Sequence, residues 1–151
     1  MGPVFSDGIG AGDDVDIKAI RAKIVDLICA RFPELQPYAR AEPAKKIQTP
    51  AAMAYPIDRV TYDETFDEGA TIVMPVRLYL TQEPSAVDQD ALDDYITPRG
   101  PKSVPQYMHR NHPTLDDLVM DARIREARNY GLWPVAQVSF LGIEFMYEIR
   151  V

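Results

Sequence analysis

Two histidines, a group of aspartates and one cysteine are the residues best suited to chemistry in this sequence. His109 and His112 are three residues apart, a spacing that can place two imidazoles on one helix face as metal ligands. A structural zinc site needs four ligands, and Pro113 directly after the pair prevents the helix from continuing. We therefore expect two surface histidines and no bound metal.

The aspartates Asp88, Asp90, Asp93 and Asp94 form a dense acidic group that could hold a divalent cation or supply an acid–base pair. A helix–loop–helix calcium site would need a glycine at the sixth loop position and a closing glutamate, and this segment has neither. The spacing instead favours the solvated face of an amphipathic helix. A second acidic group has the same interpretation and comprises Tyr62, Asp63, Glu64 and Asp67.

Cys29 is the only cysteine, which excludes an intrachain disulfide and a multi-cysteine zinc site. Its neighbours are apolar, whereas a nucleophilic cysteine needs an electropositive, partly open site and a partner base. We expect a buried side chain that packs as a small apolar group.

Arg123, Arg125 and Arg128 follow one another in a segment that we expect to be a strand. In a strand the first two would protrude on the same side, where they could contact phosphate or an acidic partner. The alternative is pairing with Glu144 or Glu148 across the sheet. Cross-strand or intersubunit pairing is favoured over nucleic-acid binding.

Three helices are expected to position these residues. Apolar residues recur at helix spacing over residues 15–32, after acidic residues suited to an N-terminus, and Pro33 ends the run. A second helix spans about 83–96, and its apolar stripe is Val87, Ala91, Leu92 and Tyr95. A short third helix covers about 103–110, with Ser103 as its cap.

Strands account for most of the remaining chain. The prolines in residues 33–56 leave only short edge pieces near 38–41 and 52–62, whereas apolar residues alternate clearly over 70–81. Pro75 within that run predicts an edge strand or a bulge. The C-terminal third reads as a strand over 116–130, a turn at 129–131 and a second strand from 135. A change of parity near Gly142 predicts a bulge there.

The whole chain, of 151 residues, suits one α+β domain: an antiparallel-rich sheet packed against the N-terminal helix and a middle helix over residues 13–151. The glycine-rich residues 1–12 are expected to form a flexible arm. The formal net charge is −7, and residues 58–94 hold ten acids and two bases. These properties disfavour a dedicated nucleic-acid binder and, with no apolar run of membrane length or secretory signal, predict a soluble protein.

The order of motifs resembles a known family. The features, in chain order, are an N-terminal helix, a proline-rich stretch that ends in Pro50-Ala51-Ala52, the run from Tyr62 to Ala70, the strand Val73–Leu80, the helix Gln89–Ile96, Gly100-Pro101-Lys102-Ser103-Val104, Ala127-Arg128-Asn129-Tyr130-Gly131 and Phe140-Leu141-Gly142-Ile143-Glu144-Phe145. Over residues 15–151 this set resembles the tail terminator and related head–tail joining proteins of long, non-contractile-tailed bacteriophages, especially those of actinobacteria.

The resemblance implies a structural protein of the virion, made in the host cytoplasm, with no catalytic residues and no cofactor. It implies a homo-oligomer, typically a hexameric ring, that caps the tail tube, contacts the tail tube protein and a neck protein, and lets genomic DNA pass without specific binding. Asp88, Asp90, Asp93 and Asp94 would then face the DNA channel, or else solvent.

Two alternatives stay open. The first is a head–tail stopper or adaptor ring of the same connector, because the segment from Pro105 to Pro113 departs from the family's usual alanine-rich helix. The second is a small metal-dependent enzyme or binding module that uses the aspartates or the His109 and His112 pair.

Overall fold

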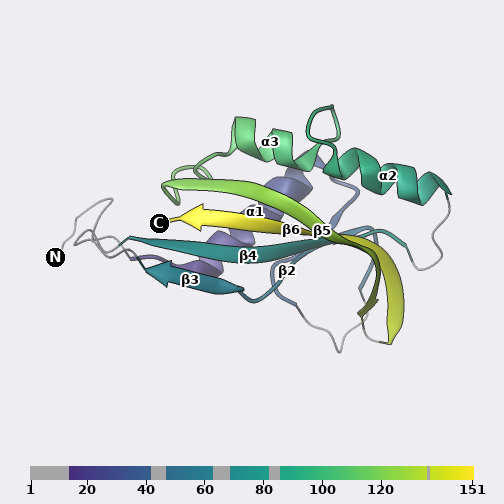
Figure 1. Cartoon of the computed structure of the whole chain (residues 1–151), viewed down its shortest axis with the longest axis horizontal. Helices are drawn as coiled ribbons and strands as arrows, with labels where there is room; N and C mark the ends of the chain where they lie inside the picture. The colour runs from purple at the N-terminus through teal and green to yellow at the C-terminus, as the bar shows by residue number, and fades with distance from the viewer. Residues whose placement is uncertain (1–13, 42–46, 63–68, 82–85, 136) are drawn as a thin grey trace.

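The computed structural model describes residues 14–41, 47–62, 69–81, 86–135 and 137–151. These residues form one α+β domain with three helices and a six-stranded, mostly antiparallel sheet (Figure 1). The predicted fold class is therefore confirmed. The expected arm at residues 1–12 and the acidic residues Asp63, Glu64 and Asp67 lie outside the described residues.

The helices are α1 (Ile17–Arg31), α2 (Ala86–Ile96) and α3 (Val104–Asn111), close to the predicted ranges. Local capping fixes two of their starts. The Asp16 carboxylate accepts hydrogen bonds from the backbone N–H groups of Lys18 and Ala19, and the Ser103 hydroxyl accepts one from Gln106 N–H. None of the helices within the described ranges is long and apolar enough to cross a membrane.

The sheet has the strand order β1-β2-β4-β6-β5. β2 and β3 pair with the same edge of β4, β2 with its C-terminal half and β3 with its N-terminal half. The strands are β1 (Gln36–Tyr38), β2 (Ala51–Ala54), β3 (Arg59–Tyr62), β4 (Ala70–Tyr79), β5 (Asp121–Val135) and β6 (Val138–Arg150). Only β1 and β2 run parallel. The single strand expected over 52–62 is thus divided into β2 and β3.

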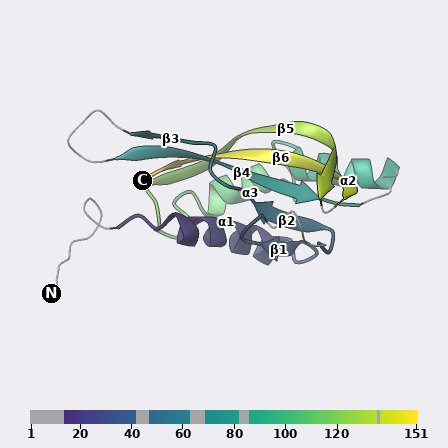
Figure 2. The same ribbon diagram turned by 90° about the horizontal axis from the view of Figure 1, so that it is seen from below.

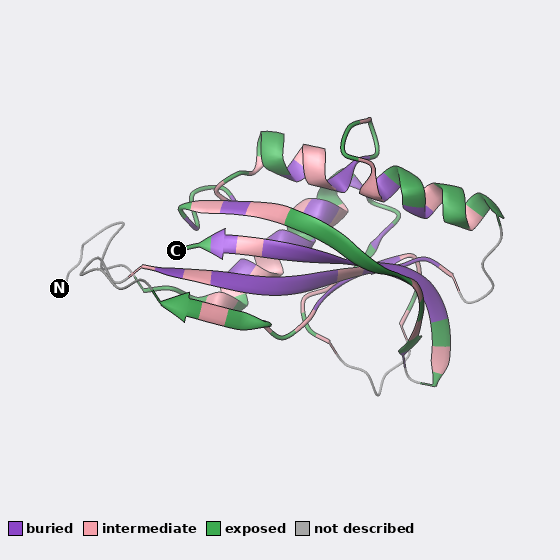
Figure 3. Cartoon of the chain, viewed as in Figure 1, coloured by how far each residue is buried: buried purple, intermediate pink, exposed green. Residues whose placement is uncertain are grey.

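All three helices pack on one face of the sheet, where α1 lies alongside it (Figure 2). The main core joins α1 residues such as Ile24 and Ile28 to alternate residues of β4 and β6, among them Leu78 and Phe145. A smaller apolar cluster covers part of the opposite face and contains Met53, Tyr79, Val135 and Phe140. Figure 3 shows β4 and β6 buried along most of their length, because both sheet faces are covered there.

Pro75 was expected to mark an edge strand or a bulge, and that prediction is wrong. It lies inside β4, opposite Met146, in an uninterrupted register with β6. Its carbonyl accepts a hydrogen bond of 3.0 Å from Tyr55 N–H, so its backbone polar groups face the gap between β2 and β3. A central strand tolerates this proline because the missing N–H would have pointed into that gap.

The expected turn at 129–131 is also wrong, because β5 continues through it and pairs with β6 as far as Val135 and Val138. Two register shifts place extra residues in β5, between Ile124 and Glu126 and between Arg128 and Gly131. The bulge expected in β6 near Gly142 is absent from that strand, since β6 pairs with β4 without a break. The change of parity there reflects the second apolar cluster, to which Phe140 belongs.

Candidate functional site

The three arginines of β5 line two different hollows. Arg123 and Ile124 line a hollow beside α3, whereas Arg125 and Arg128 line a hollow on the sheet face opposite the helices. In register Arg123 lies opposite Glu148, the residue that Arg125 also approaches, so these two arginines lie beside the same glutamate although they line different hollows. Whether they form one contact strip stays a prediction.

All three arginines form ion pairs within the sheet. Two of them pair with a glutamate of β6, as the cross-strand alternative predicted. Arg128 Nε lies 2.9 Å from Glu144 Oε1, and Arg125 Nε lies 4.0 Å from Glu148 Oε1. Arg123 instead lies 3.5 Å from Asp121 of its own strand. Their role in contacts with other subunits stays a prediction.

The most extensive polar network centres on Arg77, a β4 residue to which the sequence motifs assigned no role. Its guanidinium lies 3.9 Å from the ring centroids of both Tyr55 and Trp133. Its Nε donates to Glu144 Oε2 at 2.9 Å, and its Nη1 donates to the Tyr79 hydroxyl at 3.3 Å. The Tyr79 hydroxyl also shares a hydrogen bond with the Tyr55 hydroxyl. This network joins the β2 side of the sheet to the far part of the β5–β6 hairpin.

Glu144 is the buried acid of this network, with 3% of its surface exposed. Burial alone would raise the pKa of its carboxyl, but hydrogen bonds from Arg77 and Arg128 outweigh burial and lower the pKa below its usual value. Glu144 is therefore ionised at neutral pH. The signal that could have identified it is a charged residue at position 144 between the apolar residues Ile143 and Phe145.

A shallow groove lies between α3 and the outer edge of β5. Proline and isoleucine side chains form its apolar part, and it carries cationic side chains but no acidic residue. Its lining comprises Pro98, Pro105, Gln106, His109, Arg110, Arg123 and Ile124. Of these, Arg123 was a predicted contact residue and His109 a rejected ligand, whereas Arg110 was not predicted.

Three of the four α2 aspartates are exposed, as expected for the solvated face of a helix: Asp90, Asp93 and Asp94. The fourth, Asp88, is partly buried. The Tyr130 hydroxyl of β5 donates to Gln89 O at 3.2 Å, which holds the bulged part of β5 beside α2. Burial, and then the nearby Asp93, raise the Tyr130 pKa. Whether these acids face a DNA channel stays a prediction.

Val87 corrects the expected apolar stripe of α2. Leu92 and Tyr95 are buried and Ala91 packs partly against the core, but Val87 is 76% exposed. Its position in the first turn of α2 carries it beyond the reach of the core. Val87 and the exposed aspartates lie on the outer side of α2, where Tyr130 of β5 approaches Asp90 and Asp93.

His109 and His112 do not come together. His112 Nδ1 lies 2.8 Å from Asp116 Oδ1, and its Nε2 lies 3.1 Å from the Tyr107 hydroxyl, whereas His109 is exposed on α3. Asp116 also pairs with Lys23 of α1 at 3.1 Å. The tyrosine–histidine–aspartate series ties α3 to the turn in which Leu115, Asp116 and Asp117 have positive φ.

No group of three or more histidine, cysteine or acidic residues is placed to hold a metal within the described ranges. Cys29 was expected to be buried; it packs against the core but is only partly buried. Burial, with smaller contributions from Asp26 and Glu34, raises the pKa of its thiol to about 11. The thiol is therefore protonated at neutral pH, the unreactive form of cysteine.

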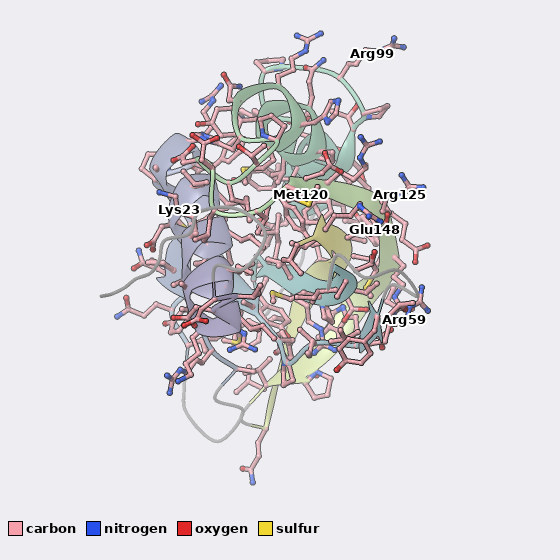
Figure 4. The ribbon with its side chains drawn as sticks, turned by 90° about the vertical axis from the view of Figure 1, so that its left-hand side faces the viewer. Lys23, Arg59, Arg99, Met120, Arg125 and Glu148 are labelled. Carbon is pink, nitrogen blue, oxygen red and sulfur yellow. The ribbon has the colours of Figure 1, made fainter. Side chains whose placement is uncertain are left out.

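Large exposed apolar side chains form two sets at opposite ends of the strands. Tyr62 at the end of β3 lies opposite Ala70, the first residue of β4, and Met120 N–H donates to the carbonyl of Arg150, the last residue of β6. Because β4 and β6 are antiparallel, both exposed residues lie at the same end of the sheet, and Leu118 is in the loop before β5. Figure 4 looks onto this end, where Met120 lies near the centre. The other exposed apolar residues are Val87 at the start of α2 and Tyr130 and Leu132 of β5, toward the end of the domain where α2 begins above the curved β5–β6 hairpin (Figure 1).

Comparison with known proteins adds no assignment to this geometry. No family model matches the chain, and no curated protein matches it significantly.

Proposed function

We propose that the chain is a virion structural protein, a tail terminator that forms a ring, caps the tail tube and joins the tail to the neck. The ordered motifs from Pro50 to Phe145 support the family assignment. The observation in the structure that carries the proposal is the pair of exposed apolar sets at opposite ends of the strands.

Two different surfaces on one chain favour head-to-tail association. A two-fold dimer uses the same patch on both subunits, whereas a ring joins one patch to a different patch on the next copy. Tyr62, Leu118 and Met120 at one end and Val87 and Leu132 at the other supply two such patches. Isolated surface apolar residues need no explanation, but grouped ones mark interaction sites.

The sheet edges fit this use. β5 is a long edge strand with two bulges and alternating charges, devices that prevent uncontrolled strand pairing. β1 and β3 on the opposite side are short. Association through side chains at the two ends of the domain, and not through edge pairing, follows from these features.

Native mass spectrometry of the purified protein, followed by electron microscopy with tail tubes, tests the proposal. We expect a six-subunit ring, in solution or on added tubes, that binds one end of the tube and stops its extension. A ring that binds the neck but not the tube would favour a stopper or adaptor. A strict monomer that ignores tail tubes would contradict the proposal.

A further inference from the structure

The exposed face of α2 combines an apolar residue with two carboxylates. Val87, Asp90 and Asp94 are spaced three and four residues apart, so they share one side of the helix, and all three are exposed. Val87 is among the most exposed large apolar residues of the chain, and the helix has no basic residue in its last turn. An apolar residue at the exposed face of a helix can anchor it in a groove, and flanking carboxylates favour a groove that carries cations.

The groove between α3 and β5 has the complementary composition. Pro98, Pro105 and Ile124 supply apolar surface, and Arg110 and Arg123 supply two cations with no acid in the lining. Arg110 is exposed and makes no ion pair within the described ranges. Among the described residues Arg123 pairs with the half-exposed Asp121 at 3.5 Å, a weak surface pair that a better partner can replace.

A chain cannot fill this groove with its own α2. Ile96 ends the helix and Pro98, two residues later, already lines the groove, so the helix is fixed at the end of the groove and not inside it. Figure 1 shows α3 and α2 following one another along the β5 side of the domain. The helix face and the groove are therefore separate surfaces of one chain, and each can contact a different neighbouring copy at the same time.

We propose that the Val87-Asp90-Asp94 face of α2 docks in the α3–β5 groove of a second copy of this chain. The inference rests on the proposed ring and names its subunit contact: the Val87 end of one copy meets the next copy at the α3–β5 groove, which contains Arg123 and Ile124 and so lies beside the Met120 end of β5. Asp90 and Asp94 lie against Arg110 and Arg123 of the next copy, and Val87 contacts the proline and isoleucine surface. Because the contact joins two different patches, repetition gives a closed ring or a filament.

Charge exchange between the two surfaces tests this contact. The double variant Asp90→Arg with Asp94→Arg makes both surfaces basic, and Arg110→Glu with Arg123→Glu makes both acidic. Each variant alone should need at least about tenfold more protein than wild type for half-assembly, because like charges then face each other. Mixed in equal amounts, the two variants should assemble again, since each supplies the opposite charge to its neighbour.

The mixing step separates a lost contact from a folding defect, because two misfolded variants do not repair one another. The matched control is Asp26→Arg with Arg40→Glu, two exposed positions on α1 and beyond β1, which should assemble as wild type does. Native mass spectrometry and light scattering report the oligomer.

The outcomes distinguish the contact from the function. Two results would overturn the contact and leave the proposed ring intact. In the first, each reversed variant alone assembles as well as wild type; in the second, the mixture stays dispersed while wild type assembles. A mixture that recovers only dimers would support the contact and contradict the ring. A wild-type chain that remains a monomer at every concentration and on tail tubes would overturn both.

Discussion

The guanidinium of Arg77 lies between the rings of Tyr55 and Trp133, which belong to parts of the chain far apart in sequence. Stacking on both faces leaves the edge of the guanidinium for hydrogen bonds, and Glu144 and Tyr79 accept them. A lysine could supply the charge but neither the planar stack nor the fork of donors. Arg77 therefore holds the far part of the β5–β6 hairpin against the β2 side of the sheet.

Arg77→Ala should lower the free energy of unfolding by about 2–4 kcal/mol, because it removes one partner of the buried Glu144 carboxylate. Arg77→Lys should recover only part of this loss. Urea unfolding measures the effect, and the emission of Trp133, the only tryptophan, should shift to the red as the ring gains water. Arg99→Ala at an exposed position is the control, with an expected change within about 0.5 kcal/mol. An Arg77→Ala variant as stable as this control would contradict the proposed role.

The Glu144 carboxyl gives the fold a defined acid sensitivity. Its pKa is lowered in the folded state, so the stability that its ionised form contributes is present above its ordinary value of 4.5 and is lost as the pH falls through the folded pKa. Asp116, whose pKa His112 and Lys23 lower, contributes in the same direction.

Glu144→Gln should therefore be less stable than wild type at neutral pH, and its stability should fall less between pH 5 and pH 3. Thermal unfolding at a series of pH values measures both slopes. Asp116→Asn serves as the comparison at an exposed site. Parallel pH curves for wild type and Glu144→Gln would show that Glu144 does not titrate as described.

At the scale of the elements, local signals predicted the helices well. Asp16 and Ser103 cap their helices as polar residues before an apolar run should, because capping depends on residues within one turn. The alternation over 70–81 predicted a strand for the same local reason, and β4 confirms it.

The errors arose where distant pairing decides the outcome. Asn129-Tyr130-Gly131 has the composition of a turn, yet pairing with β6 on both sides converts it into a bulge in which Asn129 has φ 58°. Pro75 is tolerated because of a gap between two other strands. The Arg77 network was missed because its partner Glu144 lies 67 residues away.

Two glycines of the β5–β6 hairpin pair with one another but differ in their surroundings. A Cβ at Gly142 would lie 2.6 Å from the backbone oxygen of Leu78 and 3.2 Å from the Trp133 side chain, whereas a Cβ at Gly131 would meet nothing within 4 Å. The backbone of β4 cannot yield without loss of its pairing with β6. Gly142 therefore permits the close approach of β6, β4 and the stacked tryptophan.

Gly142→Ala should cost about 1–3 kcal/mol of unfolding free energy through overpacking, and Gly131→Ala should change it by less than about 0.5 kcal/mol. Chemical unfolding of both variants measures this difference. Equal stability of the two variants would contradict the packing described at Gly142.

At the scale of the whole molecule, the negative charge is concentrated in the part of the chain that includes α2. If α2 lines a DNA channel, or if it forms the subunit contact, neutralising its aspartates should affect assembly differently. In a DNA channel, changing Asp88, Asp90, Asp93 and Asp94 to asparagine should slow DNA passage and lower infectivity without affecting assembly. In the subunit contact, the same change should weaken assembly by removing the attraction to Arg110 and Arg123. Measurement of ring formation and infectivity with one set of virions separates the two.

The central claim is that this chain closes into a ring on the tail tube. The most direct measurement is the mass of the purified protein by native mass spectrometry, with and without tail tubes. We predict an assembly of six chains, formed in solution or only at the tube end. A protein that remains a single 17.0 kDa chain under both conditions would contradict the claim.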